Sequence, residues 1–403
     1  MSNFWNLVSF EYKKILCKRS VQITLFLAVF VTAFGVVGTL LGGTYTNPKE
    51  SNYSAMVKDR AYVRTLAGRQ LDGELIMEAA KAYAKIPEKD QYQTTEEYQE
   101  FARPYSEIYG IIHTIFNTNL KWFNREDFQM LTREQAERFY IMRRQQQEQL
   151  VEQTSMSEKA KEQVLALDAQ IKIPFIFSYT DGYTRFFVLT NSFGLTAAFV
   201  MAICVAPLFS GEYTSGTDQI ILSSKHGKNR LIAAKLFTGF SLAAVISLVL
   251  TALSYGLSME IFGADGADAP LQLYTILSPY PVTMGKTAML LAVCTFFACL
   301  MTAAVTMLLS ARLKSSFGVI ILVGLLLIVP MLINVPETNI VLYNLFHLLP
   351  MQMMAFWSVM EGIQYELFGM VVRPYVFLPL FAAVVSGILT PFAYRFFKNH
   401  QIG

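Results

Sequence analysis

Charged residues are scarce in this chain, and their scarcity indicates its class. Only 16% of its 403 residues are charged, whereas 53% are hydrophobic and 13% are aromatic. The mean hydropathy is +0.37. Several apolar runs approach the roughly 20 residues that a helix needs to cross about 30 Å of hydrocarbon. This composition is that of a polytopic membrane protein rather than of one water-soluble domain.

Cysteine and histidine are too few and too scattered to indicate metal or disulfide chemistry. The four cysteines lie in or beside the apolar runs: Cys17, Cys204, Cys294 and Cys299. The soluble segment 47–182 contains none of them, so no disulfide framework is expected there. The four histidines are widely separated: His113, His226, His347 and His400. Their spacing suggests neither an H-E-x-x-H metal motif nor a Ser/His/Asp set, so no catalytic or metal site is expected.

The chain also lacks an energy source of its own. The phosphate loop G-x-x-x-x-G-K-[ST] is most nearly approached at Gly285-Lys286-Thr287, but Tyr280 stands where its first glycine should be. The apolar runs carry hydroxyl and amide side chains and almost no charge at mid-membrane, which argues against an ion relay. We therefore expect no enzyme activity, no bound cofactor and no nucleic-acid partner, and the energy for any work that the protein does must be supplied from elsewhere.

The charges that are present separate a soluble segment from membrane segments. Residues 47–182 hold 18 Lys/Arg and 21 Asp/Glu, whereas the rest of the chain holds 15 basic and 9 acidic residues. Because Lys and Arg in short loops stay in the cytoplasm, this distribution places both termini inside and residues 44–182 outside. We predict a cell-membrane protein, with a bacterial membrane as the expected location.

Six spans follow from the apolar runs, and the predicted fold is all-α. Their approximate bounds are 21–43, 184–209, 231–259, 287–310, 316–335 and 374–394. The chain then divides into a cytoplasmic interfacial helix, a first-span region, an outer helical domain and a region with five further spans: 1–19, 20–43, 44–182 and 183–403. The apolar stretch 340–372 contains Pro350, Glu361 and Glu366, which suits an outer re-entrant or interfacial helical hairpin better than a span.

The first and third of these regions carry further local signals. Phe4 and Trp5 lie on the apolar side of 1–19, which favours a helix in the membrane interface over a plain basic flank. In 44–182, Thr132 with Gln135 and Ser155 with Glu158 have capping-box spacing. A helical stripe is expected to be buried there: Tyr98, Phe101, Tyr105, Ile108, Ile112 and Ile115. Its charge runs suit solvated helix faces, and a ligand-binding role for the domain stays open.

The loop between the second and third spans is more than a connector. It contains Glu212 and the pair Gly216-Thr217, followed by a short amphipathic run. A basic cluster comes next: Lys225, Lys228, Arg230 and Lys235. Positive charge between two spans fixes the loop in the cytoplasm, where residues 210–230 would form a docking surface for a cytoplasmic partner.

The order of residues in this loop resembles that of ABC-2 type transporter permeases, the membrane subunits of ATP-binding-cassette exporters. The residues that carry the resemblance are Phe209, Glu212, Gly216-Thr217, Leu222-Ser223, Arg230 and Lys235. The resemblance extends to six spans, the N-terminal interfacial helix and the outer hairpin, and it leaves out 44–182. A departure follows Leu222-Ser223, because Ser224-Lys225-His226-Gly227 replaces the family's usual aromatic residue or proline.

The resemblance implies a coupling helix at about 212–223 that rests in a cleft of a separate ATPase, which binds the ATP. Glu212 would cap or orient this helix and contact the partner, and Gly216 and Thr217 would permit its tight start. Arg230 and Lys235 would pair with lipid phosphates or with the ATPase, and Leu222 belongs to the coupling helix. The plainer interpretation of Glu212 is a helix cap favoured by the helix dipole.

We therefore hypothesise a permease subunit of an ABC exporter, paired with a second copy or a paralogue in the membrane lipid. It would move an amphipathic or hydrophobic cargo outward. Candidate path-lining residues are polar residues within spans: Asn191, Thr196, Thr295 and Thr302. Such side chains more often bond the backbone or a neighbouring helix. The alternative function is a non-transporting membrane sensor or scaffold whose outer domain binds a ligand.

Overall fold

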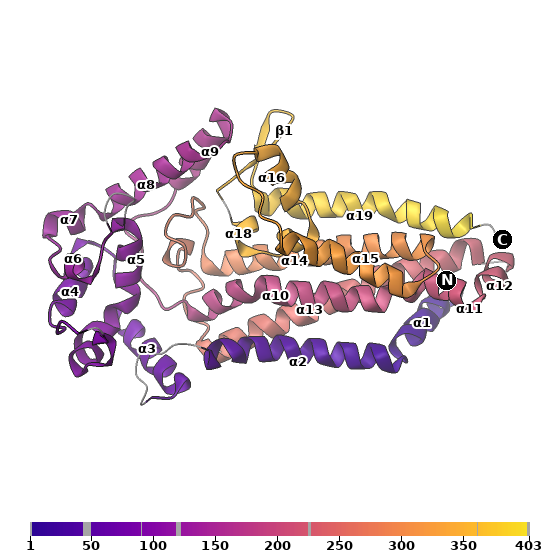
Figure 1. Ribbon diagram of the computed structural model, residues 1–403, viewed down its shortest axis with the longest axis horizontal. Helices are drawn as coiled ribbons and strands as arrows, with labels where there is room; N and C mark the ends of the chain where they lie inside the picture. The colour runs from indigo at the N-terminus through magenta and orange to yellow at the C-terminus, as the bar shows by residue number, and fades with distance from the viewer. Residues whose placement is uncertain are drawn as a thin grey trace.

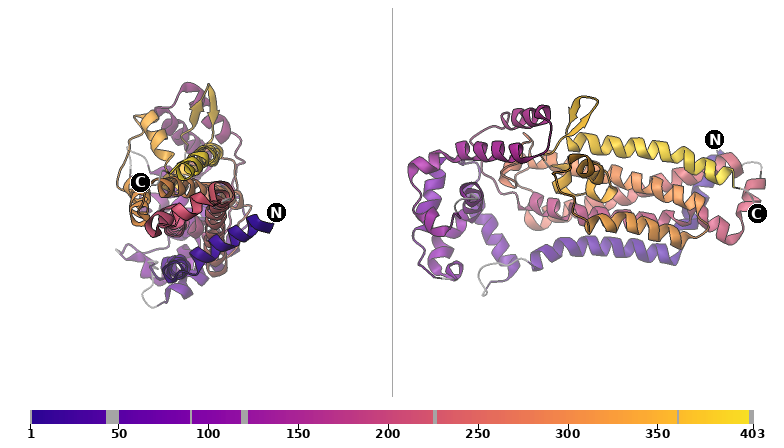
Figure 2. Two further views of the ribbon diagram at one scale, coloured as in Figure 1. Left: turned by 90° about the vertical axis from the view of Figure 1, so that its right-hand side faces the viewer. Right: turned by 45° about the horizontal axis from the view of Figure 1, so that its top comes forward.

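The computed structural model describes residues 2–42, 50–89, 91–117, 122–224, 227–360 and 362–400. A long helical bundle and a smaller helical domain lie end to end (Figure 1). Both termini lie at the end of the bundle away from the smaller domain (Figures 1 and 2). We call this the terminal end of the bundle, and the other the domain end.

Within the described ranges, five helical segments are long and apolar enough to cross a membrane. They are α2 (Arg19–Leu41), α10 (Asp181–Val205) continued by α11 (Pro207–Ser215), α13 (Ile232–Phe262) preceded by the π-helix η4 (Gly227–Leu231), α14 (Met284–Arg312) and α19 (Pro374–Lys398). Helix α14 packs against α10, α13 and α19, and α2 packs against α10 and α13. The outward side of α2 exposes Phe26, Phe30 and Phe34, an apolar surface of the kind that membrane lipid covers.

The remaining predicted span, 316–335, is shorter than expected. Helix α15 (Ser316–Ile328) has 13 residues and continues only through the 3₁₀ helix η6 (Val329–Met331). Pro330 lies in η6 and has no amide hydrogen, so it removes one bond of the α-helical ladder at the point where α15 gives way to η6. Helix α15 packs against α14 and α10 as part of the bundle.

The smaller domain is helical, as predicted, and has its own core. Its α-helices are α3 (Asn52–Leu66), α4 (Gly73–Tyr83), α5 (Ser106–Phe116), α6 (Arg125–Gln129), α7 (Arg133–Glu137), α8 (Phe139–Gln153) and α9 (Glu158–Asp168). Its shorter elements are η1 (Tyr92–Thr94), η2 (Tyr98–Ala102) and η3 (Arg103–Tyr105). Fully buried aromatic side chains, among them Tyr83, Phe128, Phe139 and Phe175, fill the centre of the domain.

Local signals in this domain had mixed outcomes. Thr132 and Gln135 form the predicted capping box at α7. The second predicted box is wrong, because α9 begins at Glu158 and is capped by Ser157, whose hydroxyl accepts from the amide of Ala160. The predicted stripe crosses three short elements, η2, η3 and α5, rather than one helix. Its members Tyr98, Ile108, Ile112 and Ile115 are nevertheless buried.

At the domain end, residues 340–372 form short helices followed by a strand pair instead of a helical hairpin. The helices are α16 (Ile340–His347), α17 (Pro350–Met353) and α18 (Phe356–Val359). Strands β1 (Tyr365–Leu367) and β2 (Met370–Val372) pair antiparallel, with Leu367 opposite Met370. The two residues between them, Phe368 and Gly369, both have positive φ, the conformation that two-residue hairpin turns require.

A buried ion pair holds the smaller domain on the bundle. The Arg143 guanidinium on α8 contacts both carboxylate oxygens of Asp168 on α9, at 2.7 and 3.3 Å. The same group donates to the carbonyl oxygens of Ile276 and Ser278, at 2.8 and 3.3 Å, in the loop between α13 and α14. That loop contains the short 3₁₀ helix η5 (Leu271–Leu273). Arg143 therefore links two helices of the domain to the bundle.

Replacing Arg143 by Met should destabilise the protein strongly. The substitution leaves Asp168 as an uncompensated buried charge, which costs about 3–5 kcal/mol. The midpoint of thermal unfolding of the purified protein should fall accordingly. Arg144→Met is the matched control, because Arg144 is 71% exposed and pairs only with exposed Glu148, a contact worth about 0–1 kcal/mol. Equal unfolding midpoints for the two variants would contradict the clamping role of Arg143.

Candidate functional site

Three buried charged side chains and a partly exposed one form a cluster at the terminal end of the bundle. Lys235 on α13 is fully buried, and its Nζ lies 2.6 Å from Glu212 Oε1 and 2.9 Å from the Glu11 carboxylate. Lys14 also pairs with Glu212. Glu11 and Glu212 are each only 2% exposed. We call these residues, Glu11, Lys14, Glu212 and Lys235, the ion cluster; its two positive and two negative charges balance.

The ion cluster joins three elements that are far apart in the sequence. Glu11 and Lys14 belong to α1 (Ser2–Leu16), Glu212 to α11 and Lys235 to α13. Glu11 and Lys14 share one side of α1, since residues three apart on a helix are neighbours. A second hydrogen bond joins α1 to α13, from Tyr12 Oη to Ser241 Oγ at 2.6 Å. Helix α1 is thus fixed to the bundle by charge and by hydrogen bonding.

Glu212 also fixes the turn that ends α11. Gly216 has φ +67° in the left-handed region, and its amide donates to the carbonyl of Tyr213. The Thr217 amide donates to the Glu212 carbonyl, which completes a Schellman C-cap. The Thr217 hydroxyl lies 2.5 Å from Glu212 Oε2. A side chain with a Cβ would be strained at Gly216, so this residue sets the direction in which the chain leaves α11.

Hydrogen bonds hold α11 against the turn between α14 and α15. Ser310 Oγ on α14 accepts from the amides of Phe209 and Ser210, both at 3.0 Å. Tyr213 Oη donates to the carbonyl of Ala311 at 2.7 Å, and Thr214 Oγ1 donates to that of Lys314 at 2.9 Å. Helix α11 therefore contacts α1 and α13 on one side and α14 and the following turn on another.

The segment after Gly216 presents an exposed surface. Helix α12 (Asp218–Ser223) buries Leu222 and leaves Ile220 71% exposed. Lys228 and Arg230 in the following π-helix η4 are also exposed. Figure 1 places α12 at the extreme terminal end of the bundle, beside α11. The tip of the molecule therefore exposes an isoleucine beside two basic residues.

A family model described as "ABC-2 family transporter protein" matches residues 18–390. The chain belongs to this family. Comparisons with curated proteins and with solved structures found no match. The match covers the spans, the smaller domain and the segment around Glu212, so the protein is a multi-pass membrane transport protein of the ABC-2 family. Membership implies partnership with ABC ATPase subunits.

In this ABC-2 family transporter protein, the residues predicted for coupling divide into two groups. Glu212, Thr217 and Lys235 come together in and around the ion cluster, with Gly216 as the turn beside them. Leu222 packs inward from α12. Arg230 is exposed and forms no ion pair with a described residue, and Lys225 and His226 lie outside the described residues.

Two details differ from what the resemblance implies. The single helix expected at 212–223 is two helices, α11 and α12, because Gly216 ends the first. Lys235, for which a lipid or ATPase partner is implied, is fully buried and pairs with Glu11 and Glu212 instead. Glu212 lies in the last turns of α11, so it is not an N-terminal helix cap.

The four candidate path-lining residues do not form one group. Asn191 lies at the domain end of the bundle and lines a cavity with α16 and α17. Thr196 and Thr302 each donate to a carbonyl oxygen four residues earlier in their own helix, both at 2.8 Å. Thr295 is fully buried on α14, and its hydroxyl has no partner among the described residues. The assignment of these residues to a path stays a prediction.

The partners Glu11 and Lys14 were missed from the sequence. The signal was present, because Glu11 is the one acidic residue of a segment whose other charges are basic. Ser310 and Tyr213 were missed as well, and nothing in the spacing of a serine in an apolar helix indicates that it caps another helix across the bundle.

The ion cluster should respond to its charge balance rather than to the loss of one contact. Lys235→Met leaves two buried carboxylates with one lysine and should lower stability by about 3–5 kcal/mol. Lys235→Met with Glu11→Gln restores neutrality, since Lys14 still pairs with Glu212, and should recover much of that loss. Arg230→Met is the exposed control. Thermal unfolding of the purified variants measures the differences, and a double variant no more stable than Lys235→Met alone would contradict the charge-balance account.

Proposed function

We propose that this chain is the permease subunit of an ABC exporter and that a separate ATPase docks on α12 and η4. The observation that carries the proposal is the exposed α12–η4 surface directly beside the ion cluster. A partner that contacts Ile220 pushes on a helix whose neighbour α11 is bound to α1, α13 and α14. Family membership supports the identity of that partner as an ABC ATPase.

The proposed orientation of the protein in the membrane is the one that its charge distribution favours. The terminal end, with exposed Lys228 and Arg230, lies in the cytoplasm, because short basic loops resist translocation. The smaller domain then lies outside. Helix α15 with η6 supplies the sixth crossing, since the chain passes from the terminal end at Arg312 to the domain end at α16. Its 16 residues span roughly 24 Å, so the bilayer is thinner there or the chain beyond Met331 completes the crossing.

The side chains of the ion cluster determine how a push would spread. ATP, bound by the partner, supplies the energy. Movement of α12 acts on Gly216, and Glu212 carries it to α13 through Lys235 and to α1 through Lys14. Ser310 and Tyr213 carry the same movement to α14. The segments that line a transport route would thereby shift together.

Direction, cargo and assembly complete the proposal. Two permease subunits, identical or related, would assemble with two ATPase subunits in the membrane. The cargo would be amphipathic or hydrophobic, because the crossing helices are apolar and almost free of charge at mid-membrane. It would move outward, as in an exporter.

Ile220→Asp should abolish ATPase docking without unfolding the permease. Ile220 is 71% exposed, so the substitution leaves packing intact but places a charge in the contact surface. Loss of a central apolar contact at an interface costs about 2 kcal/mol or more, which is at least about tenfold in affinity. The permease is affinity-purified from its native membranes, and ABC ATPase subunits are quantified by mass spectrometry. Ile141→Asp, at a 53% exposed site on α8, is the matched control. Equal ATPase recovery from both variants would refute docking on α12.

Cysteine labelling should place the two ends on opposite sides of the membrane. In a background where exposed Cys17 is replaced by Ser, Gln149→Cys on α8 should react with a membrane-impermeant maleimide in intact cells. Gln219→Cys on α12 should react only after permeabilisation. Labelling of Gln219→Cys in intact cells would reverse the proposed orientation.

A further inference from the structure

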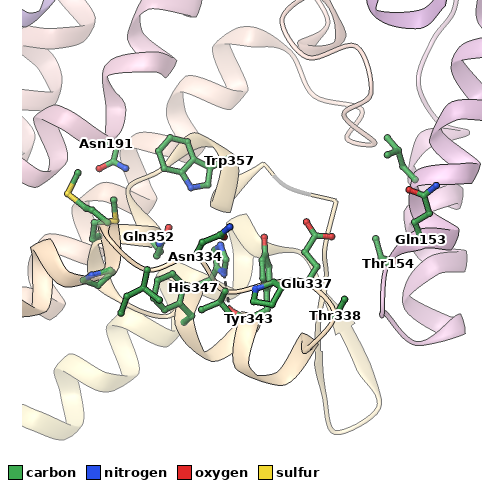
Figure 3. Close-up of a pocket in the computed structure, with 18 residues that line it drawn as sticks. Gln153, Thr154, Asn191, Asn334, Glu337, Thr338, Tyr343, His347, Gln352 and Trp357 are labelled. Atoms are coloured by element: carbon green, nitrogen blue, oxygen red, sulfur yellow. Dashed lines mark hydrogen bonds between the residues drawn. The ribbon is translucent and has the colours of Figure 1, made fainter. Parts of the chain in front are cut away.

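A large cavity lies at the domain end, where the smaller domain meets the bundle. Its volume is about 860 Å³, within the range of small-molecule sites. It is open to one side and is lined by the end of α8, by residues 330–338, by α16 and α17, and by Asn191 of α10. In the view of Figure 3, Gln153 and Thr154 lie on one side of it and Asn191 and Trp357 on the other.

A second cavity of about 350 Å³ continues the first toward α9 and residues 275–279. Four residues line both cavities: Leu150, Thr154, Glu337 and Trp357. We call the two together the outer cavity. The Arg143 clamp lies beside it, since Ser278 both accepts from Arg143 and lines the second cavity. The smaller domain thus forms one wall of the outer cavity and is held there by a buried ion pair.

Buried polar side chains in the walls lack protein partners. Gln147, Asn191 and Ser278 are 3%, 9% and 4% exposed. Gln147 Oε1 and Ser278 Oγ have no hydrogen-bond partner among the described residues, and no described residue bonds the Asn191 amide. Leaving such groups unsatisfied costs about 1–3 kcal/mol each. They are positioned to bind a polar group that enters the cavity.

The charge of the outer cavity has one sign. Among the described residues that line it, Glu337 alone carries a charge. Glu337 is exposed and forms no ion pair with a described residue. Burial lowers the pKa of His347, so this imidazole is neutral at neutral pH. The remaining lining is mixed, with apolar side chains such as Leu150, Phe346 and Met351 among uncharged polar ones.

We propose that the outer cavity binds a cationic amphiphile: an ammonium group pairs with Glu337 while an apolar chain lies against Trp357 and its neighbours. Gln147, Asn191 and Ser278 hydrogen-bond polar groups of the same molecule. An anionic amphiphile is disfavoured, because it would bring a second negative charge into a site without a cation. The inference rests on the proposed function in one respect, since it identifies this ligand as the class of cargo released outside.

Binding is tested with the permease alone in lipid nanodiscs, so the result does not depend on ATPase coupling. Trp5→Phe and Trp122→Phe leave Trp357 as the only tryptophan of the chain. Titration with decyltrimethylammonium should change its fluorescence saturably, and decyl sulfate should not. Glu337→Gln should weaken binding of the cation about threefold to tenfold, as expected for loss of one charge-assisted contact.

Two further variants separate binding from partition into the lipid. Glu366→Gln removes an exposed carboxylate on β1 that lines neither cavity, and it should leave the titration unchanged. Leu150→Trp fills the region that the two cavities share. In a protein where Trp357 is also replaced, the fluorescence of this new tryptophan should not change saturably with decyltrimethylammonium, because the site is blocked. Equal titrations for the parent and Glu337→Gln, or equal responses to the cation and the sulfate, would overturn the proposed site. ATPase recovery in the Ile220 experiment would stand in that case, so the two proposals fail separately.

Discussion

Burial of the Lys235 ammonium is the constraint on which the terminal end of this transporter depends. A fully buried amine is tolerated only with opposite charge in contact, and Glu11 and Glu212 supply it from two other elements. Lys14 then balances the second carboxylate. Because neutrality requires all three elements, α1, α11 and α13 cannot separate without exposing or isolating a charge. The N-terminal helix is thereby fixed to the bundle by buried charge as well as by packing.

The two ends of the bundle are joined by the helices that bear these contacts. Helix α10 continues into α11 at the terminal end of the bundle and carries Asn191 at the outer cavity. Helix α13 carries Lys235 and leads into the loop that contains Ser278. The clamp of Arg143 then fixes the smaller domain to that same loop. A shift of α11 thus has a continuous packed route to the outer cavity through α10 and, across the Glu212–Lys235 pair, through α13.

Much of this arrangement could be predicted from the sequence, because long apolar runs and basic loops depend on local composition. Gly216 and Thr217 were singled out through the resemblance to the family, and the left-handed φ of Gly216 explains why the turn requires glycine. What could not be predicted depends on contacts between distant segments. The pairing of Lys235 with Glu11, for example, joins residues 224 apart. The β1–β2 hairpin is local, and its signal of aromatic and β-branched residues around Gly369 was missed. Helix α15 ends just before Pro330. This proline was a local signal for the end of the helix, but the sequence analysis counted it as part of the apolar run.

The claim that the ion cluster transmits movement is tested most directly by the fluorescence of Trp357 in the single-tryptophan protein reconstituted with its ATPase. The account predicts that ATP changes this emission in the parent protein. It also predicts that Glu11→Gln with Lys235→Met reduces the change while ATP hydrolysis continues, because the neutral double variant folds but Glu212 no longer pairs with Lys235, which leaves the routes through α10 and α14. An ATP-dependent change of the same size in the double variant would contradict the account.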